Sequence, residues 1–315
     1  MRIARFLFLV LALLGALATV SCSPQKTPER PRNVILIGWD GAQRNHVKES
    51  LENGKLPNLR RLSSEGALVA IDALRTTDTK AGWTEILTGY VPEVTGVYSN
   101  NRYGPIPRGY TVFERLEAFF GADNFVTVAV IGKKGNMDCT PPSEDGGKPI
   151  PGGPFYYTKE GMDVFINGLN EDAKVGAKAL DLLDQYQDKP FFFFVHFAEV
   201  DHKGHSFGEN STQYGDALVS ADTWTGKIME KLKELGLYDK SLIYVTADHG
   251  FDEDRKTHTD APYIFLATND RRVIRGGDRI DITPTILDRL GVDISKIEPQ
   301  LDGHPLTKPY QPRIW

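Results

Sequence analysis

The sequence predicts one α/β domain built on a mainly parallel β-sheet. Short apolar runs alternate along the chain with amphipathic segments of helical period, which is the pattern of strands joined by helices. Acidic residues and histidines stand just after three of the apolar runs, where parallel strands would end. The 315 residues, 40% hydrophobic and 25% charged, suit a globular domain of this kind.

The first half of the chain supplies three expected strands and three expected helices. "NVILIG", "ALVAI" and "FVTVAVIG" are short apolar runs fit for buried strands. "LPNLRRLSSEG", "WTEILTG" and "TVFERLEAFFG" read as helices that a glycine ends. In chain order, these elements are the strand 33–38, the helix 56–66, the strand 67–71, the helices 83–89 and 111–121, and the strand 125–132.

The second half repeats the alternation. "PFFFFVHF", "SLIYVTA" and "PYIFLAT" are apolar runs, and longer amphipathic segments lie between and after them. These elements are the helix 171–187, the strand 190–197, the helix 217–236, the strands 241–247 and 262–268, and the helix 281–291. The segment 133–161 is rich in Gly and Pro, so we expect an insertion near 133–165 that is either a lid over the site or a surface loop.

Side chains that can bind metal ions follow the expected strands. Asp and neutral imidazole together suit zinc or a similar divalent ion, and two such ions can stabilise both oxygens of an in-line displacement at phosphorus. The alternative for the most isolated of these residues, His258, is a solvated loop histidine. The candidate ligands are Asp40, Asp201, His205, Asp248, His249 and His258.

A nucleophile is expected at Thr79, near the start of a short helix. The free N–H groups and the dipole of a helix N-terminus stabilise anions there. A metal ion beside the hydroxyl would lower its pKa and make the alkoxide accessible. The alternative for Thr79 is a helix cap, a position that threonine suits.

These stretches resemble the alkaline phosphatase superfamily, and most of all its type I phosphodiesterase/nucleotide pyrophosphatase branch. The matching stretches are "VILIGWDG", "TKAGWTEILTG", "PEVTGVYSN", "VDHKGH" and "TADHG". The resemblance implies a three-layer sandwich with a mainly parallel central sheet flanked by helices. It also implies a hydrolase that acts on a small phosphate ester through two divalent metal ions, which we expect to be Zn²⁺.

The resemblance also implies residue roles. Asp201, His205 and His258 would hold one metal ion. The other would be held by Asp40, Asp248 and His249, with Thr79 beside it as the nucleophile and also a ligand. Asn100 stands 21 residues after Thr79, the family's position for an amide that binds a non-bridging oxygen.

Two departures from related patterns bear on the substrate. Family phosphodiesterases often have an asparagine shortly after the nucleophile and an aromatic residue or histidine next to it, whereas Gly82 and Trp83 stand here. Sulfatases of the superfamily carry "C/S-x-P-S-R", and this chain has "T-K-A-G-W" instead. Monoesterases add cations around the phosphoryl group, for which the candidates are Lys80, Lys133 and Lys134.

Three other functions stay open from the sequence. The same core could serve a phosphomonoesterase, a phosphonate or sulfate ester hydrolase, or a phosphoryl-group transferase. A protein of another class would be an inactive lipoprotein that binds a ligand at the cell surface. A structural envelope protein that keeps its metal ions for stability is the third.

The N-terminus predicts export. Arg2 and Arg5 precede an apolar stretch, 6–18, that is too short to span a bilayer, so 1–22 is expected to be a signal peptide. "TVSC" resembles a bacterial lipobox, so we expect Cys22 to be lipidated, and a plain secretory signal is the alternative. Residues 23–32 would be a polar tether, and 33–315 the hydrolase domain.

The charge pattern limits the partners. The net charge is −5 and the sequence contains no large basic patch, so we do not expect nucleic acid as a partner. We expect contact with a membrane only through the lipid anchor, on a protein that faces the periplasm or the cell surface of a bacterium. The mature chain would keep one cysteine, Cys139, which cannot form an internal disulfide.

Overall fold

The computed structural model describes residues 31–310, and strands and helices alternate along them as the sequence predicts. The expected signal peptide 1–22, with Cys22, and the tether up to residue 30 lie outside the described residues. No helix among the described residues is long and apolar enough to cross a membrane.

The central sheet has eight strands in the order β10-β2-β9-β8-β1-β7-β3-β6. Neighbouring strands are parallel except at β9, which is antiparallel to both β2 and β8, so the predicted mainly parallel sheet is confirmed. The strands are β1 (Asn33–Trp39), β2 (Ala67–Asp72), β3 (Val126–Ile131), β6 (Val164–Asn167), β7 (Phe191–Phe197), β8 (Ser241–Thr246), β9 (Tyr263–Thr268) and β10 (Gly277–Asp278).

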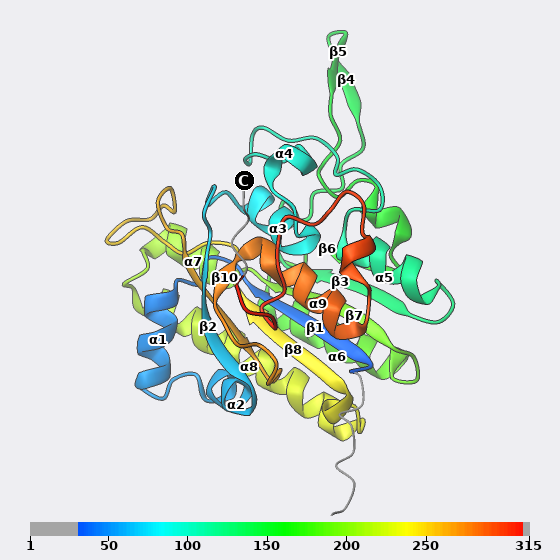
Figure 1. Ribbon diagram of the computed structural model, residues 1–315. Coiled ribbons are helices and arrows are strands. Elements are labelled where there is room, and N and C mark those ends of the chain that lie inside the picture. The colour runs from blue at the N-terminus through cyan, green and yellow to red at the C-terminus, as the bar shows by residue number, and fades with distance from the viewer. Residues whose placement is uncertain (1–30, 311–315) are drawn as a thin grey trace, which may run out of the picture.

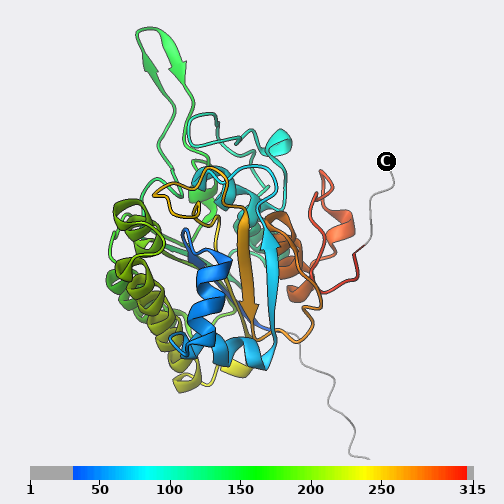
Figure 2. The same cartoon turned by 90° about the vertical axis from the view of Figure 1, so that its left-hand side faces the viewer.

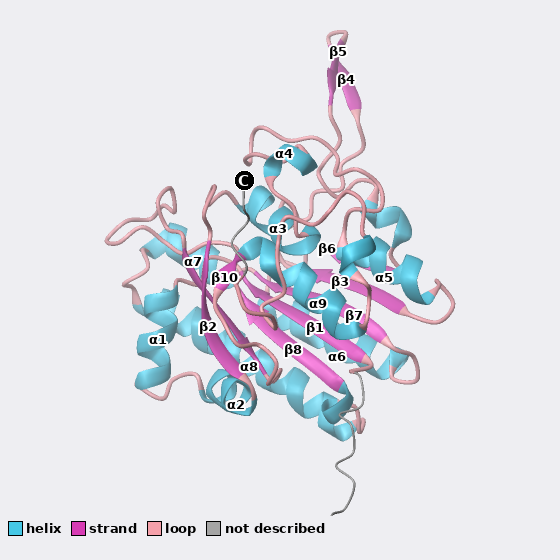
Figure 3. Cartoon of the chain, in the orientation of Figure 1, coloured by secondary structure: helices cyan, strands magenta, loops and turns pink. Residues whose placement is uncertain are grey.

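Helices cover both faces of the sheet and make a three-layer sandwich (Figure 1, Figure 3). The long helices α6 and α8 pack on one face together with α1 and α2, and α3, α5 and α9 lie on the other, as the side view in Figure 2 shows. The helices are α1 (Arg44–Glu52), α2 (Pro57–Glu65), α3 (Thr79–Thr88), α4 (Pro92–Thr95), α5 (Val112–Phe120), α6 (Asp172–Tyr186), α7 (Glu199–Phe207), α8 (Thr212–Glu234) and α9 (Ile282–Leu290).

Burial of both sheet faces explains the unbroken apolar strands. All seven residues of β1 and all seven of β7 are buried, and the two strands pair directly, Val34 opposite Phe192. A strand covered by helices on both sides has no polar face, so it reads as a continuous apolar run rather than an alternating one. The acidic residues and histidines of the candidate site then follow the carboxyl ends of these strands.

Several elements differ from the sequence expectation. Helix α3 begins at Thr79, the expected position near a helix start, although the apolar pattern indicated a helix only from 83; its first turn is largely buried without being apolar in pattern. Helix α7 follows β7 at once, where the run of charged residues and histidines gave no apolar period to find. The sequence pattern also missed α1, α4 and the edge strands β6 and β10, which are short and have little apolar period.

The Gly- and Pro-rich insertion contains an exposed hairpin. Strands β4 (Ser143–Asp145) and β5 (Lys148–Ile150) are antiparallel, and all six residues are exposed. The hairpin projects away from the body of the molecule (Figure 1, Figure 2). The start of the insertion behaves differently, because residues 136 and 137 are buried next to the sheet. A lid role for the insertion stays a prediction.

Candidate active site and metal centre

The candidate residues meet at the carboxyl ends of adjacent strands. In the sheet order β8-β1-β7-β3, Asp40 follows β1, helix α7 with Asp201 and His205 follows β7, and the pair Asp248 and His249 follows β8. Thr79 reaches the same place from the N-terminus of α3. These side chains therefore lie together at the edge of the sheet that the parallel topology predicts.

Thr79 is the first residue of α3, and Asp78 is the N-cap. The Thr79 hydroxyl oxygen lies 3.2 Å from Nε2 of His249 and is buried, so it faces the cluster rather than capping its own helix. Glycine at 82 permits this arrangement, because a Cβ there would come within 2.9 Å of Cβ of Asp248. Trp83 is buried and packs against Phe194 of β7, so it belongs to the core.

Asp40, Asp248 and His249 form one half of the cluster, and all three are fully buried. Nε2 of His249 lies 3.4 Å from Oδ1 of Asp40 and 3.4 Å from Oδ2 of Asp248. The other oxygen of Asp248 accepts a hydrogen bond from the backbone N–H of Gly41 at 3.3 Å. The turn after β1 thus orients the carboxylate that follows β8.

Asp201, His205 and His258 form the other half. One turn of α7 separates Asp201 from His205, so both lie on the same helix face, with Nε2 of His205 3.2 Å from Oδ1 of Asp201. The ring of His258 stacks on that of His249 with 3.8 Å between centroids. Asp201 joins the two halves, because it can share one ion with His205 and His258 or another with Asp40 and His249.

The cluster consists of hydrogen-bond acceptors that face one another, which is the arrangement of a cation site. Nδ1 of His249 lies 2.9 Å from the carbonyl of Gly250 and Nδ1 of His205 lies 2.8 Å from that of Lys256, so each ring donates its Nδ1 proton there and turns Nε2 towards the cluster. Three buried carboxylate oxygens at this point accept no hydrogen bond, although imidazole nitrogens come as near as 3.2 Å to them: Oδ1 of Asp40, Oδ1 of Asp201 and Oδ2 of Asp248.

The electrostatics agree with this interpretation. Burial, together with the carboxylates of Asp40 and Asp201, raises the pKa of Asp248 well above its usual range. Burial and the nearby ring of His258 lower the pKa of His249 to about 4, which leaves its imidazole neutral near pH 7. Buried charge is costly unless it is paired or binds a metal. Asp and neutral His residues of this kind fit a divalent cation such as zinc.

Asn100 lies beside the N-terminus of α3. Its Oδ1 accepts a hydrogen bond from the backbone N–H of Lys80 at 3.0 Å, and its Nδ2 is 3.4 Å from Oδ1 of Asp78. In this arrangement the amide orients the first turn of α3. Its expected contact with a substrate oxygen stays a prediction.

The turn after β3 brings two further residues to the cluster. Nζ of Lys133 pairs with Oδ2 of Asp201 at 2.5 Å, and the buried amide of Asn136 donates to Oδ2 of Asp40. The same amide nitrogen lies 2.7 Å from Nε2 of His196, a buried histidine of β7. Asn136 was missed, and the strand-end rule applied to β3 could have found it.

A buried ion pair fixes α3 against β8. Arg279 has no exposed surface, and its guanidinium donates to Oε2 of Glu85 at 3.0 Å, to the carbonyl of Asp248 at 2.7 Å and to that of Thr76 at 2.7 Å. Arg75 donates to both oxygens of the same Glu85 carboxylate. One side chain therefore links the segment before Thr79 to the strand end that carries Asp248.

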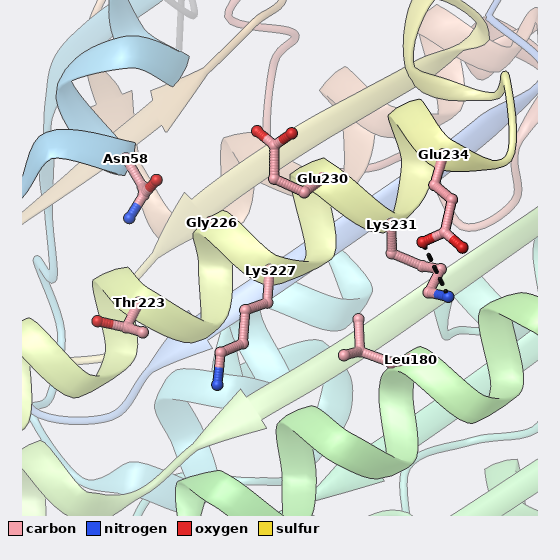
Figure 4. A pocket seen from close by; sticks show the side chains of 8 residues that line it. All are labelled: Asn58, Leu180, Thr223, Gly226, Lys227, Glu230, Lys231 and Glu234. Carbon is pink, nitrogen blue, oxygen red and sulfur yellow. Dashed lines mark ion pairs between the residues drawn. The ribbon is translucent and has the colours of Figure 1, made fainter.

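A surface pocket of about 400 Å³ lies elsewhere, along α8 (Figure 4). Leu180 of α6 and Asn58 of α2 contribute to its walls together with residues of α8. Lys231 and Glu234 form an ion pair there at 3.2 Å. None of its lining residues is a candidate site residue.

Solved structures share this architecture. One is a protein of the alkaline phosphatase superfamily from Vibrio parahaemolyticus, with a TM-score of 0.60, 20% identity, and coverage of 90% of this chain and 72% of that one. Another is the lipoteichoic acid synthase LtaP from Listeria monocytogenes, with a TM-score of 0.58, 18% identity, and coverage of 88% and 76%. The fold is therefore that of the alkaline phosphatase superfamily.

Sequence comparison gives the family. Residues 34–300 match the family model of type I phosphodiesterase/nucleotide pyrophosphatase, and the chain belongs to this family. A curated relative is ectonucleotide pyrophosphatase/phosphodiesterase family member 1 of Mus musculus. It is 24% identical over an alignment of 325 residues, gaps included, that covers 93% of this chain. The match spans 34% of that relative's length, so this chain corresponds to about a third of it.

Proposed function

We propose that this chain is a metal-dependent hydrolase of phosphate esters, of the phosphodiesterase/nucleotide pyrophosphatase type, with Thr79 as its nucleophile. The observation that carries the proposal is the hydroxyl of Thr79, held at a helix N-terminus 3.2 Å from Nε2 of His249 and beside three buried carboxylates. Family membership supports the same reaction class.

The unpartnered carboxylate oxygens support two bound divalent cations, which we propose are zinc. Asp201, His205 and His258 would hold one, and Asp40, Asp248 and His249 the other, next to Thr79. When bound, the ions would neutralise the carboxylates, make the Thr79 alkoxide accessible and stabilise charge on the phosphoryl oxygens.

The chain's own residues would carry a two-step displacement. Oγ1 of Thr79 gives up its proton and attacks phosphorus in line, the bond to the leaving oxygen breaks, the leaving oxygen takes up a proton from solvent, and a phospho-threonine forms. Water then attacks the same phosphorus, the bond to Oγ1 breaks, and phosphate or a phosphate monoester leaves while Thr79 regains its proton. The dipole at the N-terminus of α3 stabilises negative charge at Oγ1 in both steps. Asn100 would donate to a non-bridging oxygen.

The test uses purified residues 23–315, with metal content measured by elemental analysis on the same sample as activity. The substrates are bis-p-nitrophenyl phosphate, p-nitrophenyl phosphate and p-nitrophenyl sulfate. We expect two zinc ions per chain and turnover of a phosphate ester that Thr79→Ala abolishes and Thr79→Ser partly keeps. Metal-free protein without turnover of any of these esters would contradict the proposal and favour a ligand-binding surface lipoprotein.

We further propose that the protein is exported and lipid-anchored. The signal-peptide pattern of 1–22 and the "TVSC" stretch support the proposal. With a lipid on Cys22, the mature protein should partition into detergent and carry a diacylglycerol mass, and Cys22→Ala should remove both. A wild-type protein recovered in the soluble fraction without added mass would contradict lipidation.

A further inference from the structure

Asn136 is a buried asparagine whose amide lies between two other buried side chains. The residue is 1% exposed and follows β3, the strand that pairs with β7. Its Nδ2 donates to Oδ2 of Asp40 and lies 2.7 Å from Nε2 of His196. A buried amide needs hydrogen-bond partners, and here one partner is a candidate metal ligand. The contact therefore bears on how that ligand binds.

The two oxygens of Asp40 face different neighbours. Oδ2 is the acceptor for Asn136. Oδ1 accepts no hydrogen bond and lies 3.4 Å from Nε2 of His249, which follows β8. The protein thus holds one oxygen of this carboxylate and leaves the other for a cation.

The turn that carries Asn136 is held by hydrogen bonds of its own. The backbone N–H of Asn136 donates to the carbonyl of Lys133 at 3.0 Å. From the end of β6, the side-chain amide of Asn167 donates to the carbonyls of Lys134 at 3.1 Å and Met137 at 3.0 Å. The position of the turn is therefore fixed by contacts that do not involve the carboxylate cluster.

His196 determines the direction of the Asn136 amide. An amide nitrogen donates hydrogen bonds and accepts none, so Nε2 of His196 accepts here and the ring carries its proton on Nδ1. The ring is buried in β7, where Trp83 and Phe194 contact it edge-on. With one N–H of the amide directed to this fixed ring, the other is directed to Asp40.

Asp248 shows the same division between its oxygens with a different donor. Its Oδ1 accepts from the backbone N–H of Gly41, and its Oδ2 accepts no hydrogen bond. Hydrogen bonds made to a metal ligand from outside the site orient that ligand, and their loss typically weakens metal binding about 10- to 100-fold. The donor to Asp40 is a side chain, so a substitution can remove it.

We propose that Asn136 is a positioning residue that holds Oδ2 of Asp40, so that Asp40 binds the ion beside Thr79 through Oδ1 alone. His196 acts through Asn136, because it directs the amide. The proposal rests on the proposed function, which assigns Asp40 to that ion.

The test measures zinc binding rather than turnover. The metal-free mature chain, residues 23–315, is titrated with Zn²⁺ against a chromophoric chelator, which gives the dissociation constants of the two ions. Asn136→Leu keeps the size of the side chain and removes its donors. It should weaken the binding of one ion roughly 10- to 100-fold and leave that of the other nearly unchanged.

Asn33→Leu is the matched control. Asn33 is also buried, and its amide donates to Oγ of Ser241 at the opposite end of β1 from Asp40. This variant should change neither dissociation constant. Circular dichroism on the same samples shows that each variant is folded.

Cobalt gives a second measurement. The visible absorption of protein-bound Co²⁺ weakens as its coordination number rises. If Asn136→Leu releases Oδ2 to bind the ion as well, its absorption should be weaker than that of the wild type and of Asn33→Leu. Unchanged zinc constants together with an unchanged cobalt spectrum would overturn the assignment, as would equal effects of the two substitutions.

A pair of substitutions at His196 provides a test that does not depend on the folding of Asn136→Leu. His196→Gln keeps an acceptor near the position of Nε2 and should bind zinc as the wild type does, whereas His196→Leu should weaken the same ion. Equal zinc binding by these two variants would overturn the role of the amide. Failure of the proposed function would look different, because the wild type itself would then bind no zinc, and the assignment of Asn136 would fail with it.

Discussion

At the scale of single residues, three buried carboxylates meet at one point without enough donors to satisfy them. Asp40, Asp201 and Asp248 each keep an oxygen that accepts no hydrogen bond. Asp252, in the loop that follows Asp248, differs from them. Its two oxygens accept hydrogen bonds from the side chains or backbone of Thr257, Thr259 and Asp260. One kind of carboxylate costs stability until a cation binds, and the other stabilises the loop that carries His258.

This contrast predicts opposite effects of two matched substitutions. In a chelator, Asp248→Asn should raise the free energy of unfolding by about 1–2 kcal/mol, because it removes a buried charge next to two others. Asp252→Asn should lower it by about 1–2 kcal/mol, because it removes an acceptor of several hydrogen bonds. Urea unfolding at pH 8 measures both.

Zinc should change which of these proteins is the more stable. With zinc present, the wild type should gain stability over its chelated form by mass action, and Asp248→Asn should gain much less. Equal gains in the two proteins would show that Asp248 does not contribute to metal binding. A chelated Asp248→Asn protein less stable than the wild type would contradict the charge argument.

At the scale of elements, α3 and α7 place the reactive groups, and each is held by a buried ionisable residue. Arg279 and Glu85 hold α3 against the end of β8. Arg279→Met should lower the free energy of unfolding by about 3–5 kcal/mol, since it leaves the buried Glu85 carboxylate with one partner fewer. Arg279→Lys should also lose stability, because an ammonium cannot replace the planar guanidinium contacts.

The control for this prediction is Arg75→Met. Arg75 binds the same carboxylate but is 24% exposed, so its loss should cost less than that of Arg279. Denaturant unfolding of the zinc-loaded variants gives the comparison. An Arg279→Met protein as stable as the wild type would show that the desolvation cost of the Arg279–Glu85 ion pair cancels its attraction.

Asp172 holds the start of α7. Its Oδ1 accepts from the backbone N–H groups of Ala198 at 2.9 Å and Glu199 at 3.2 Å, while Oδ2 is buried without a partner. Burial, together with the nearby Glu199 carboxylate, raises the pKa of Asp172 from 3.8 to about 7. The folded protein therefore keeps a proton that the unfolded chain releases.

This shift predicts a pH dependence with a definite sign. The contribution of Asp172 is fully present below the unfolded pKa and declines as the pH rises from about 4 to about 7, by roughly 4 kcal/mol in total. The side-chain amide introduced by Asp172→Asn does not titrate in this range, so the variant should gain stability relative to the wild type as the pH rises. Urea unfolding in chelator from pH 4.5 to 8 tests it, and a constant difference between the two proteins would contradict the shift.

At the scale of the whole molecule, stability comes from the sandwich and not from the projecting hairpin. Residues 143–150 are all exposed, and Ser143 pairs with Ile150, so the hairpin's ends lie side by side. Replacing 144–149 with two glycines should leave the melting temperature nearly unchanged, because exposed segments bury little apolar area. A large loss of thermal stability would contradict this expectation.

The same deletion tests the lid prediction. Turnover of a small p-nitrophenyl diester should not change if the hairpin stands clear of the site. Loss of activity on a larger ester, such as a dinucleotide, with the small diester unaffected, would support a role for the hairpin in substrate binding. If the deletion variant had the same kcat/KM as the wild type on both esters, that result would contradict a role for the hairpin in substrate binding.

The sequence alone determined the fold class and the edge of the sheet that carries the polar cluster. Strands buried on both faces must be continuously apolar, and parallel topology directs their carboxyl ends to one edge, so Asp40, Asp201 and Asp248 could be placed together before any coordinates. The sequence pattern did not reveal short elements such as α7. A helix that carries site residues has charged side chains at positions where apolar residues would otherwise recur with the helical period.

Only the tertiary structure decided which other groups meet there. Lys133 and Asn136 follow the end of a strand, so the sequence can place them near the cluster but cannot name the carboxylates that they contact. Arg279 follows no such strand end, and nothing in its local sequence indicates that it binds the carbonyl of Asp248. Hydrogen bonds and ion pairs between distant segments depend on how helices and loops pack onto the sheet. Local sequence patterns specify a strand and its end, whereas the contacts that would tune a site are made when several such ends are packed together.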